Sequence, residues 1–192
     1  MLIPQVYYER QACRFLDIGD LAFLTHEAKA LTNLGSCVSV CLFSSQLRMS
    51  SVCHAQMPER KRKSNKCYDN CPDSCTRGQS CEMDNKYVDS VLPFMIHSFD
   101  RKSIPRVMMH AIVVGGSSML PSLRSPSSVG ILNAEMTLGI LATNKIQVVH
   151  IDIGGITSRR LEVQNDTGYV YVNKKLVYKM WDRTTNHSLG KE

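Results

Sequence analysis

Along this chain of 192 residues, the spacing of apolar residues changes from the alternation typical of strands to the spacing typical of helices. This change limits the fold more than any other feature of the sequence. Segment 38–43 predicts a strand, because small or polar residues alternate there with β-branched and large apolar ones. Segment 49–57 has a less regular form of the same pattern. The short polar stretch 44–46 between them predicts a hairpin. An apolar stretch within 17–24 indicates a further strand.

Two later segments have the period of a helix. In 88–99, six apolar residues recur at helical spacing, although Pro93 interrupts the segment. In 130–143, the predicted apolar face consists of Ile131, Leu132, Met136, Ile140 and Leu141. The sequence therefore combines strand and helix patterns within one chain.

Further strands are predicted at 107–114 and 146–153, which run into Gly115-Gly116 and Gly154-Gly155. Two short strands follow at 160–163 and 169–172, joined by the Asn-Asp-Thr-Gly turn at 165–168. We therefore predict an α/β protein: a layered sheet core of mixed and antiparallel strands, with two main helices packed on one side. The length fits a single domain over 1–192.

Composition limits the functional classes. Hydrophobic content of 43% and charged content of 21% are typical of a soluble globular protein. No apolar run approaches the roughly 20 residues that cross a bilayer, and the start, 1–4, lacks the pattern of a secretory signal. We expect a cytoplasmic protein with no membrane insertion.

Net charge is +6 and is unevenly distributed. A basic cluster occupies 60–63 with Lys66, and further lysines and an arginine lie within 174–183. No aromatic residues interleave with the cluster, as a stacking platform for bases requires. We therefore expect no nucleic-acid partner, and an acidic protein partner fits the charge better.

Eight cysteines are many for a chain that we expect in a reducing compartment. Four of them lie in a polar segment at 59–84, which we interpret as an inserted loop. Cys67, Cys71, Cys75 and Cys81 are separated by three, three and five residues, unlike paired C-x-x-C zinc knuckles. An ordinary insert without metal is our expectation, and a metal or redox site is the alternative.

Cys37 is a candidate nucleophile, because Gly35 and Ser36 break an apolar segment just before it resumes as a strand. Such a break can expose a thiol beside backbone N–H groups that stabilise an oxyanion. A thiol also needs a base, and His54 on the second arm of the hairpin is the nearest. A buried core cysteine fits the same pattern. Other histidines also compete as bases: His97, His110, His150 and His187.

A family resemblance bears on this choice. The string T-N-L-G-S-C-V at 32–38 resembles the T-x-L-G-S-C-V signature of the CheD family, the chemoreceptor glutamine deamidases of chemotaxis. Further landmarks follow in the family's order from about residue 17 to 176: His54 to Pro58, Lys86 to Asp89, Val113 to Gly116, Gly130 to Asn133, Asp152 to Gly155, Arg159 or Arg160, and Thr167-Gly168. The sequence departs from the family pattern at two places. Ser50 to Cys53 stand where glycines are common in the family, and Ser117-Ser118 follow the Gly-Gly pair. These departures affect the expected positioning of the substrate.

The resemblance implies a hydrolase that acts on carboxamide C–N bonds. Cys37 is then the nucleophile that attacks a glutamine side chain and forms a thioester, and His54 is the general base. Thr32 orients His54, and backbone N–H groups around Gly35 and Ser36 bind the oxyanion. No cofactor is expected.

The resemblance also implies partners. Methyl-accepting chemotaxis receptors are the expected substrates, and the phosphatase CheC is a further expected partner. Two alternatives to the enzyme remain: a regulatory partner of CheC with little catalysis, and a metal- or redox-sensing protein that uses the cysteine-rich insert.

Overall fold

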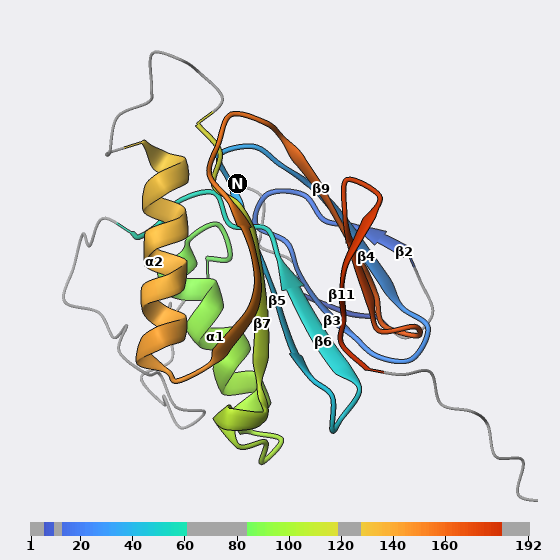
Figure 1. The fold of residues 1–192 in the computed structure, drawn as a ribbon. Helices are drawn as coiled ribbons and strands as arrows, with labels where there is room; N and C mark the ends of the chain where they lie inside the picture. Colours follow the sequence, from blue (N-terminus) through green and yellow to red (C-terminus); the bar gives the residue numbers. More distant parts are fainter. Residues whose placement is uncertain (1–5, 10–12, 61–83, 119–127, 182–192) are drawn as a thin grey trace, which may run out of the picture.

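The protein has three layers in a computed structural model that describes residues 6–9, 13–60, 84–118 and 128–181 (Figure 1). A six-stranded sheet forms the middle layer. Two helices cover one face of this sheet, and a five-stranded sheet covers the other (Figure 1). The predicted layered α/β fold, with both helices on one side, is confirmed. Within the described residues, no helix has both the length and the apolar character to span a bilayer.

The middle sheet contains the predicted hairpin. Its strand order is β1 (Val6–Glu9), β3 (Leu21–Leu24), β6 (Met49–Cys53), β5 (Val38–Ser44), β7 (His110–Gly115) and β8 (Gln147–Ile153). The four central strands pair antiparallel, whereas β1 pairs parallel with β3 and β8 parallel with β7. Every residue of β5 and β6 is buried, because layers cover both faces of these strands.

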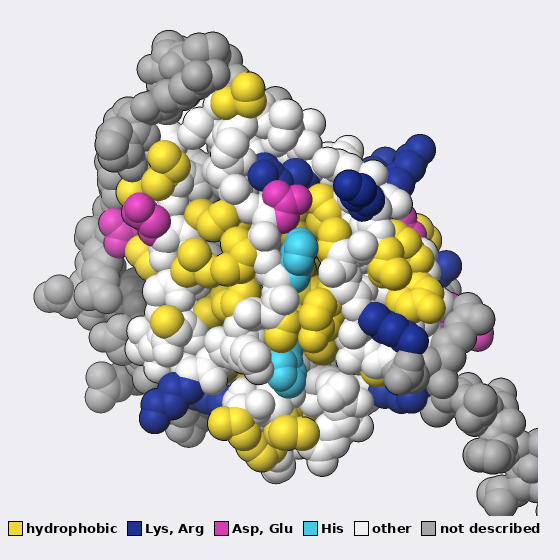
Figure 2. Space-filling model, in the orientation of Figure 1, with side chains coloured by type: hydrophobic (Ala, Val, Ile, Leu, Met, Phe, Trp, Pro, Cys, Tyr) yellow, Lys and Arg dark blue, Asp and Glu magenta, His cyan; other side chains and the backbone are white. Residues whose placement is uncertain are grey.

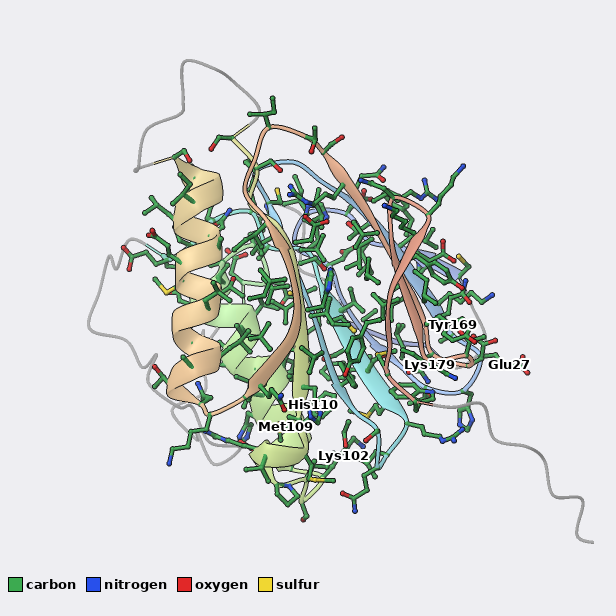
Figure 3. All side chains as sticks on the ribbon, in the orientation of Figure 1. Glu27, Lys102, Met109, His110, Tyr169 and Lys179 are labelled. Atoms are coloured by element: carbon green, nitrogen blue, oxygen red, sulfur yellow. The ribbon has the colours of Figure 1, made fainter. Side chains whose placement is uncertain are left out.

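The second sheet has the order β11 (Lys175–Lys179), β10 (Tyr169–Val172), β9 (Arg159–Gln164), β4 (Lys29–Leu34) and β2 (Cys13–Phe15). The predicted hairpin of β9 and β10 is confirmed, whereas β2, β4 and β11 were not predicted. Lys179 on β11 places its Nζ 5.7 Å from the ring centre of Tyr169 on β10 (Figure 3). This cation–π contact joins the edge strand β11 to its neighbour β10.

The helix predicted at 88–99 is confirmed as α1 (Val88–Asp100). Its six periodic apolar residues are all buried against the middle sheet: Val88, Val91, Leu92, Met95, Ile96 and Phe99. Pro93 lies inside the helix with an exposed side chain, so the missing N–H faces away from the core.

The second helix, α2 (Val129–Thr143), occupies its predicted place, but its buried face matches the predicted one only in part. Its buried residues are Gly130, Asn133, Ala134, Thr137 and Leu141. Of the predicted face, only Leu141 is buried, and Leu132 is 37% exposed. The predicted face is therefore confirmed only in part: Met136, Ile140 and Leu141 contact the core, whereas Ile131 and Leu132 do not belong to it.

The buried face of α2 consists mainly of small residues because the helix packs closely against the backbone of the sheet. A Cβ on Gly130 would lie 2.6 Å from the carbonyl oxygens of Gly116 and Ser117, so the first turn of the helix rests directly on backbone. Larger side chains are excluded there. Hydrophobic side chains therefore gather on the outer surface over α2 and β8 (Figure 2), with Ile151 of β8 50% exposed.

The strand predicted at 107–114 begins later than expected. Arg106–Met108 forms a 3-10 turn, and β7 starts at His110. Pro105 precedes this turn, and Arg106 donates hydrogen bonds to Asp100 and Asn144 at 2.8 and 2.6 Å. These contacts hold the chain across the ends of both helices, which leaves Val107 73% exposed.

β7 ends against the segment that contains Cys37. Gly115 and Gly116 both have positive φ, at 116° and 65°. The N–H of Gly116 donates to the carbonyl oxygen of Cys37 at 2.7 Å. A Cβ on Gly115 would collide with the same oxygen, so this close approach requires glycine.

We predict that Gly115→Ala lowers the free energy of unfolding by about 2 kcal/mol or more, because the added Cβ meets backbone at a strained φ. Gly139→Ala is the matched control: this exposed glycine of α2 has open space around a new Cβ. The control should raise stability by about 0.5–1 kcal/mol. Urea unfolding of both variants measures the difference, and equal effects would contradict the packing at Gly115.

Candidate active site

Three predicted site residues lie at one end of the space between the two sheets. Cys37 immediately precedes β5, His54 immediately follows β6, and Thr32 lies in β4 of the second sheet. Val38 and Ala55 exchange two backbone hydrogen bonds of 2.9 Å, which place the start of β5 beside the end of β6. Because Val38 and Ala55 pack on the helix side, the alternating residues Cys37 and His54 face the second sheet.

His54 is hydrogen-bonded across the two sheets. Its Nδ1 lies 2.8 Å from Oγ1 of Thr32 and 3.3 Å from the carbonyl oxygen of Leu16. Thr32 Oγ1 also donates to that carbonyl oxygen at 2.9 Å. Thr32 is fully buried and His54 is 6% exposed, so these bonds are shielded from water.

The three contacts determine the tautomer of His54. Thr32 has one hydroxyl proton, and the Leu16 carbonyl can only accept. If Nδ1 carries a proton, it donates to both oxygens, and the hydroxyl proton is free to point at Leu16. Without that proton, Nδ1 and the carbonyl oxygen would face each other as two acceptors. We therefore assign the neutral ring with its proton on Nδ1, which leaves a lone pair on Nε2.

Nε2 of His54 is buried and has no hydrogen-bond partner among the described residues. Burial lowers the pKa of His54, while the Leu16 carbonyl and the charges of Asp17 and Asp20 partly oppose this effect. Cys37 is 8% exposed, and burial raises the pKa of its thiol, partly opposed by its own backbone N–H. Both directions favour a neutral thiol and a neutral imidazole in the free site.

The segment before Cys37 is held by backbone and side-chain contacts. Ser117 N–H donates to the Gly35 carbonyl at 2.9 Å, and Asn133 Nδ2 donates to the Ser36 carbonyl at 2.9 Å. Among the described residues, the N–H groups of Ser36 and Cys37 make no backbone hydrogen bond. Gly35 and Ser36, both predicted site residues, therefore adjoin Cys37 with two backbone donors available.

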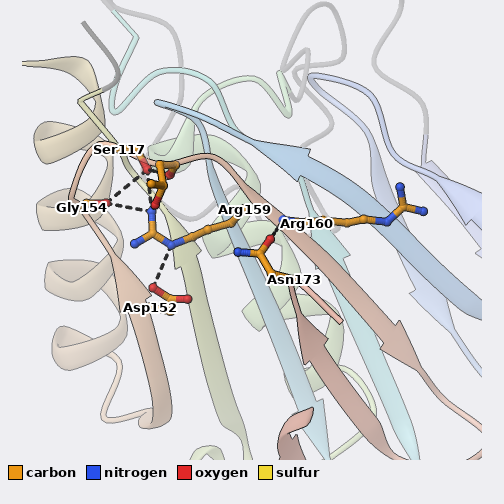
Figure 4. Close-up of polar contacts among 7 residues, drawn as sticks. Ser117, Asp152, Gly154, Arg159, Arg160 and Asn173 are labelled. Atoms are coloured by element: carbon orange, nitrogen blue, oxygen red, sulfur yellow. Dashed lines mark hydrogen bonds and ion pairs between the residues drawn. The ribbon is translucent and has the colours of Figure 1, made fainter. Parts of the chain in front are cut away.

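The landmark at Asp152 to Gly155 has a structural role. Arg159 is 9% exposed and donates to Asp152 at 2.8 Å, to the Gly154 carbonyl at 2.8 Å and to Ser117 Oγ at 2.5 Å (Figure 4). Gly154 N–H donates in turn to the Gly115 carbonyl at 2.9 Å. Arg159 thus ties the end of β8 to the glycines behind Cys37. Sequence reasoning noted this residue without a role.

Three further cysteines lie among the described residues. Cys13 is exposed, whereas Cys41 and Cys53 are buried thiols whose pKa is raised by burial, that of Cys53 to about 11. In the part of the chain that the structure describes, no three His, Cys, Asp or Glu side chains are grouped to hold a metal ion. Most of the predicted insert, at 61–83, lies outside the described residues. The prediction for its four cysteines therefore stays a prediction: Cys67, Cys71, Cys75 and Cys81.

Comparison with known proteins identifies the family. Residues 71–174, more than half of the chain, match the family model described as CheD chemotactic sensory transduction. A protein of Geobacter sulfurreducens named probable chemoreceptor glutamine deamidase CheD 2 is 30% identical over 160 residues, which cover 83% of this chain and 88% of that protein. The chain belongs to the CheD family. The resemblance drawn from residues 32–38 and the later landmarks is confirmed.

Relatives of lower identity align with a similar share of this chain. The chemoreceptor glutamine deamidase CheD of Thermotoga maritima is 24% identical over 162 residues, 84% of this chain and 91% of that protein. A probable chemoreceptor glutamine deamidase CheD of Maridesulfovibrio salexigens is 27% identical over 164 residues, 83% and 90% of the two chains. These matches extend across most of the CheD-family fold.

We predict that His54 titrates below the ordinary pKa of about 6.5, because burial disfavours its charged form. Asp17→Asn should lower this pKa further, since the carboxylate that favours the imidazolium is removed. NMR titration of the His54 ring measures both values. Asp100→Asn, which breaks an exposed ion pair with Arg106 at the end of α1, is the control and should leave the titration unchanged. An unshifted Asp17→Asn titration would contradict this electrostatic coupling.

Proposed function

We propose that this chain is a hydrolase that deamidates glutamine side chains of chemotaxis receptors, with Cys37 as nucleophile and His54 as general base. One observation carries the proposal: the buried bonds of His54 Nδ1 to Thr32 and Leu16 leave Nε2 as a free base on the face shared with Cys37. A nucleophile, a base and a group that orients the base form the pattern of acyl-transfer sites. The curated relatives are named chemoreceptor glutamine deamidases, which supplies the substrate class.

In the first half-reaction, His54 Nε2 takes the thiol proton as the sulfur of Cys37 attacks the carboxamide carbon of glutamine. A C–S bond forms, and the electron pair of the C=O bond moves to oxygen. When the carbonyl re-forms, the C–N bond breaks and the imidazolium gives its proton to the nitrogen, which leaves as ammonia. A thioester on Cys37 remains.

In the second half-reaction, water replaces ammonia. Nε2 takes one proton from water as the oxygen attacks the thioester carbon, and a C–O bond forms. Collapse of this intermediate breaks the C–S bond, and the proton on Nε2 returns to the sulfur. The product is glutamate, and Cys37 and His54 regain their starting states.

Two features of the site support these steps. The N–H groups of Ser36 and Cys37, which make no backbone hydrogen bond within the described residues, are suitable donors to the developing oxyanion. Burial keeps the thiol and imidazole neutral until substrate arrives, so a negative sulfur is formed only as it attacks. A neutral resting pair requires a base in contact with the thiol during attack, which is the role given to Nε2.

We predict that incubation with a receptor cytoplasmic fragment raises the mass of one or more glutamine peptides by about 1 Da, or by about 3 Da in H₂¹⁸O, because water oxygen enters the product. Cys37→Ala should abolish the change. Cys41→Ala is the matched control, since this buried free cysteine lies on β5, which begins directly after Cys37, and in the same inter-sheet core as Cys37. An unmodified receptor together with a tight CheC complex would favour the regulatory-partner alternative.

Thr32 gives a separate prediction for the same assay. Thr32→Val keeps the shape of the side chain but removes the hydroxyl that accepts from His54 Nδ1. We expect kcat to fall by about 10- to 100-fold, because the ring loses part of what fixes its orientation and tautomer. Thr32→Ser retains the hydroxyl and should retain most of the activity. Equal activity of the Val and Ser variants would contradict an orienting role for Thr32.

A further inference from the structure

We propose that Asn133 of α2 is a positioning residue that fixes the distance between Cys37 and His54. This inference rests on the proposed function, in which these two side chains react together. Nδ2 of Asn133 donates to the Ser36 carbonyl at 2.9 Å and to the Gln56 carbonyl at 2.9 Å. One amide group therefore joins the residue before the nucleophile to the residue two positions after the base.

The orientation of this amide is defined by its partners. Both partners are carbonyl oxygens, so both need a donor, and only the nitrogen of the side chain can supply it. Asn133 is fully buried, and its Oδ1 has no hydrogen-bond partner among the described residues. A buried oxygen without a partner lowers stability. The side chain therefore joins the two segments through its nitrogen, although its buried oxygen is left without a partner among the described residues.

The surrounding backbone makes the amide a rigid link. One turn before Asn133, Gly130 packs against the carbonyls of Gly116 and Ser117. Gly116 N–H donates to the Cys37 carbonyl, and Ser117 N–H donates to the Gly35 carbonyl. The start of α2 is thus fixed to the segment before β5 by backbone contacts, and Asn133 extends this connection to the end of β6.

Within the described residues, the Val38–Ala55 backbone pair and the Asn133 amide both connect the segment around Cys37 directly to the segment around His54 at this end of the hairpin. Proton transfer between thiol and imidazole requires hydrogen-bond distance, and a displacement of about 1 Å can reduce rates about 100-fold. Loss of the amide should therefore affect the reaction more than it affects the fold.

The chain provides a matched control for this residue. Asn165 is also buried, and its Nδ2 also donates to two backbone carbonyls, those of His26 and Arg48, at 3.2 and 3.1 Å. Arg48 lies in the turn between β5 and β6, at the opposite end of the hairpin from Cys37 and His54. Asn165→Ala removes the same kind of bond from a place remote from the site.

The first experiment compares kcat and KM for receptor deamidation in Asn133→Ala and Asn165→Ala, each corrected for the folded fraction. We expect kcat of Asn133→Ala to fall about 100-fold with KM within about threefold of wild type, because chemistry and not binding is impaired. Asn165→Ala should retain kcat within about threefold. Equal losses in both variants would overturn the proposal.

The second experiment does not depend on deamidation. Iodoacetamide labelling of Cys37 is measured by peptide mass spectrometry relative to the exposed thiol of Cys13 in the same sample. Asn133→Ala should slow the labelling of Cys37 about 10-fold when His54 is present and less than about twofold in a His54→Gln background. General loosening of the fold would change labelling equally in both backgrounds, and this result would overturn the proposal.

The two experiments separate failure of the proposal from failure of the proposed function. If wild-type protein leaves the receptor unmodified, the proposed function fails, and the labelling experiment still tests the link between Asn133 and His54. If Asn133→Ala does not fold, Asn133→Ser, which keeps a small donor, is measured in its place. If neither variant folds, the amide serves the fold and not the site, and the proposal is overturned.

Discussion

The site depends on one buried interaction, the hydrogen bond between His54 Nδ1 and Thr32 Oγ1 across the two sheets. An imidazole in a nearly dry interior needs a partner, because an unpaired buried nitrogen costs free energy. Thr32 and the Leu16 carbonyl meet this need only while the five-stranded sheet stays at its present position over β6. The same contact therefore fixes both the position of the five-stranded sheet over β6 and the lone pair on Nε2.

The burial of Cys37 and His54 makes the backbone contacts around the site important. A buried thiol resists ionisation, and a buried imidazole resists protonation. Neither group is activated by a strong local charge, so in the proposed reaction the rate must come from geometry and from donors aimed at the oxyanion. The glycines at 115–116, the Gly35 carbonyl and the Ser36 carbonyl are all held by hydrogen bonds or direct packing around Cys37. Accurate positioning takes the place of a charged environment.

Local patterns predicted the elements whose packing is local. The β5–β6 hairpin, α1 and the β9–β10 hairpin follow from periodicity and turn residues, and so does the approach of His54 to Cys37. β4 was missed although Thr32 was named, because Leu31 is only partly buried and the polar Thr32 is fully buried. The alternation along β4 is therefore unclear in the sequence. The contact of Thr32 with His54 joins two sheets, and no pattern within one segment can reveal it.

The small residues on the buried face of α2 reflect the close approach of this helix to the backbone at 116–117. Aliphatic residues of this helix define a plausible core face in the sequence, yet the protein turns glycine, alanine, threonine and asparagine toward the sheet. Large side chains would hold the helix away from the backbone at 116–117, and an apolar residue at Asn133 would leave the Ser36 and Gln56 carbonyls without this donor. Hydrophobic periodicity assumes that a helix buries the area that stabilises it most. The fully buried residues of α2 are mostly small or polar groups that let the helix approach the backbone at 116–117 and hold the Ser36 and Gln56 carbonyls, so this part of its face was not predictable from hydrophobic periodicity.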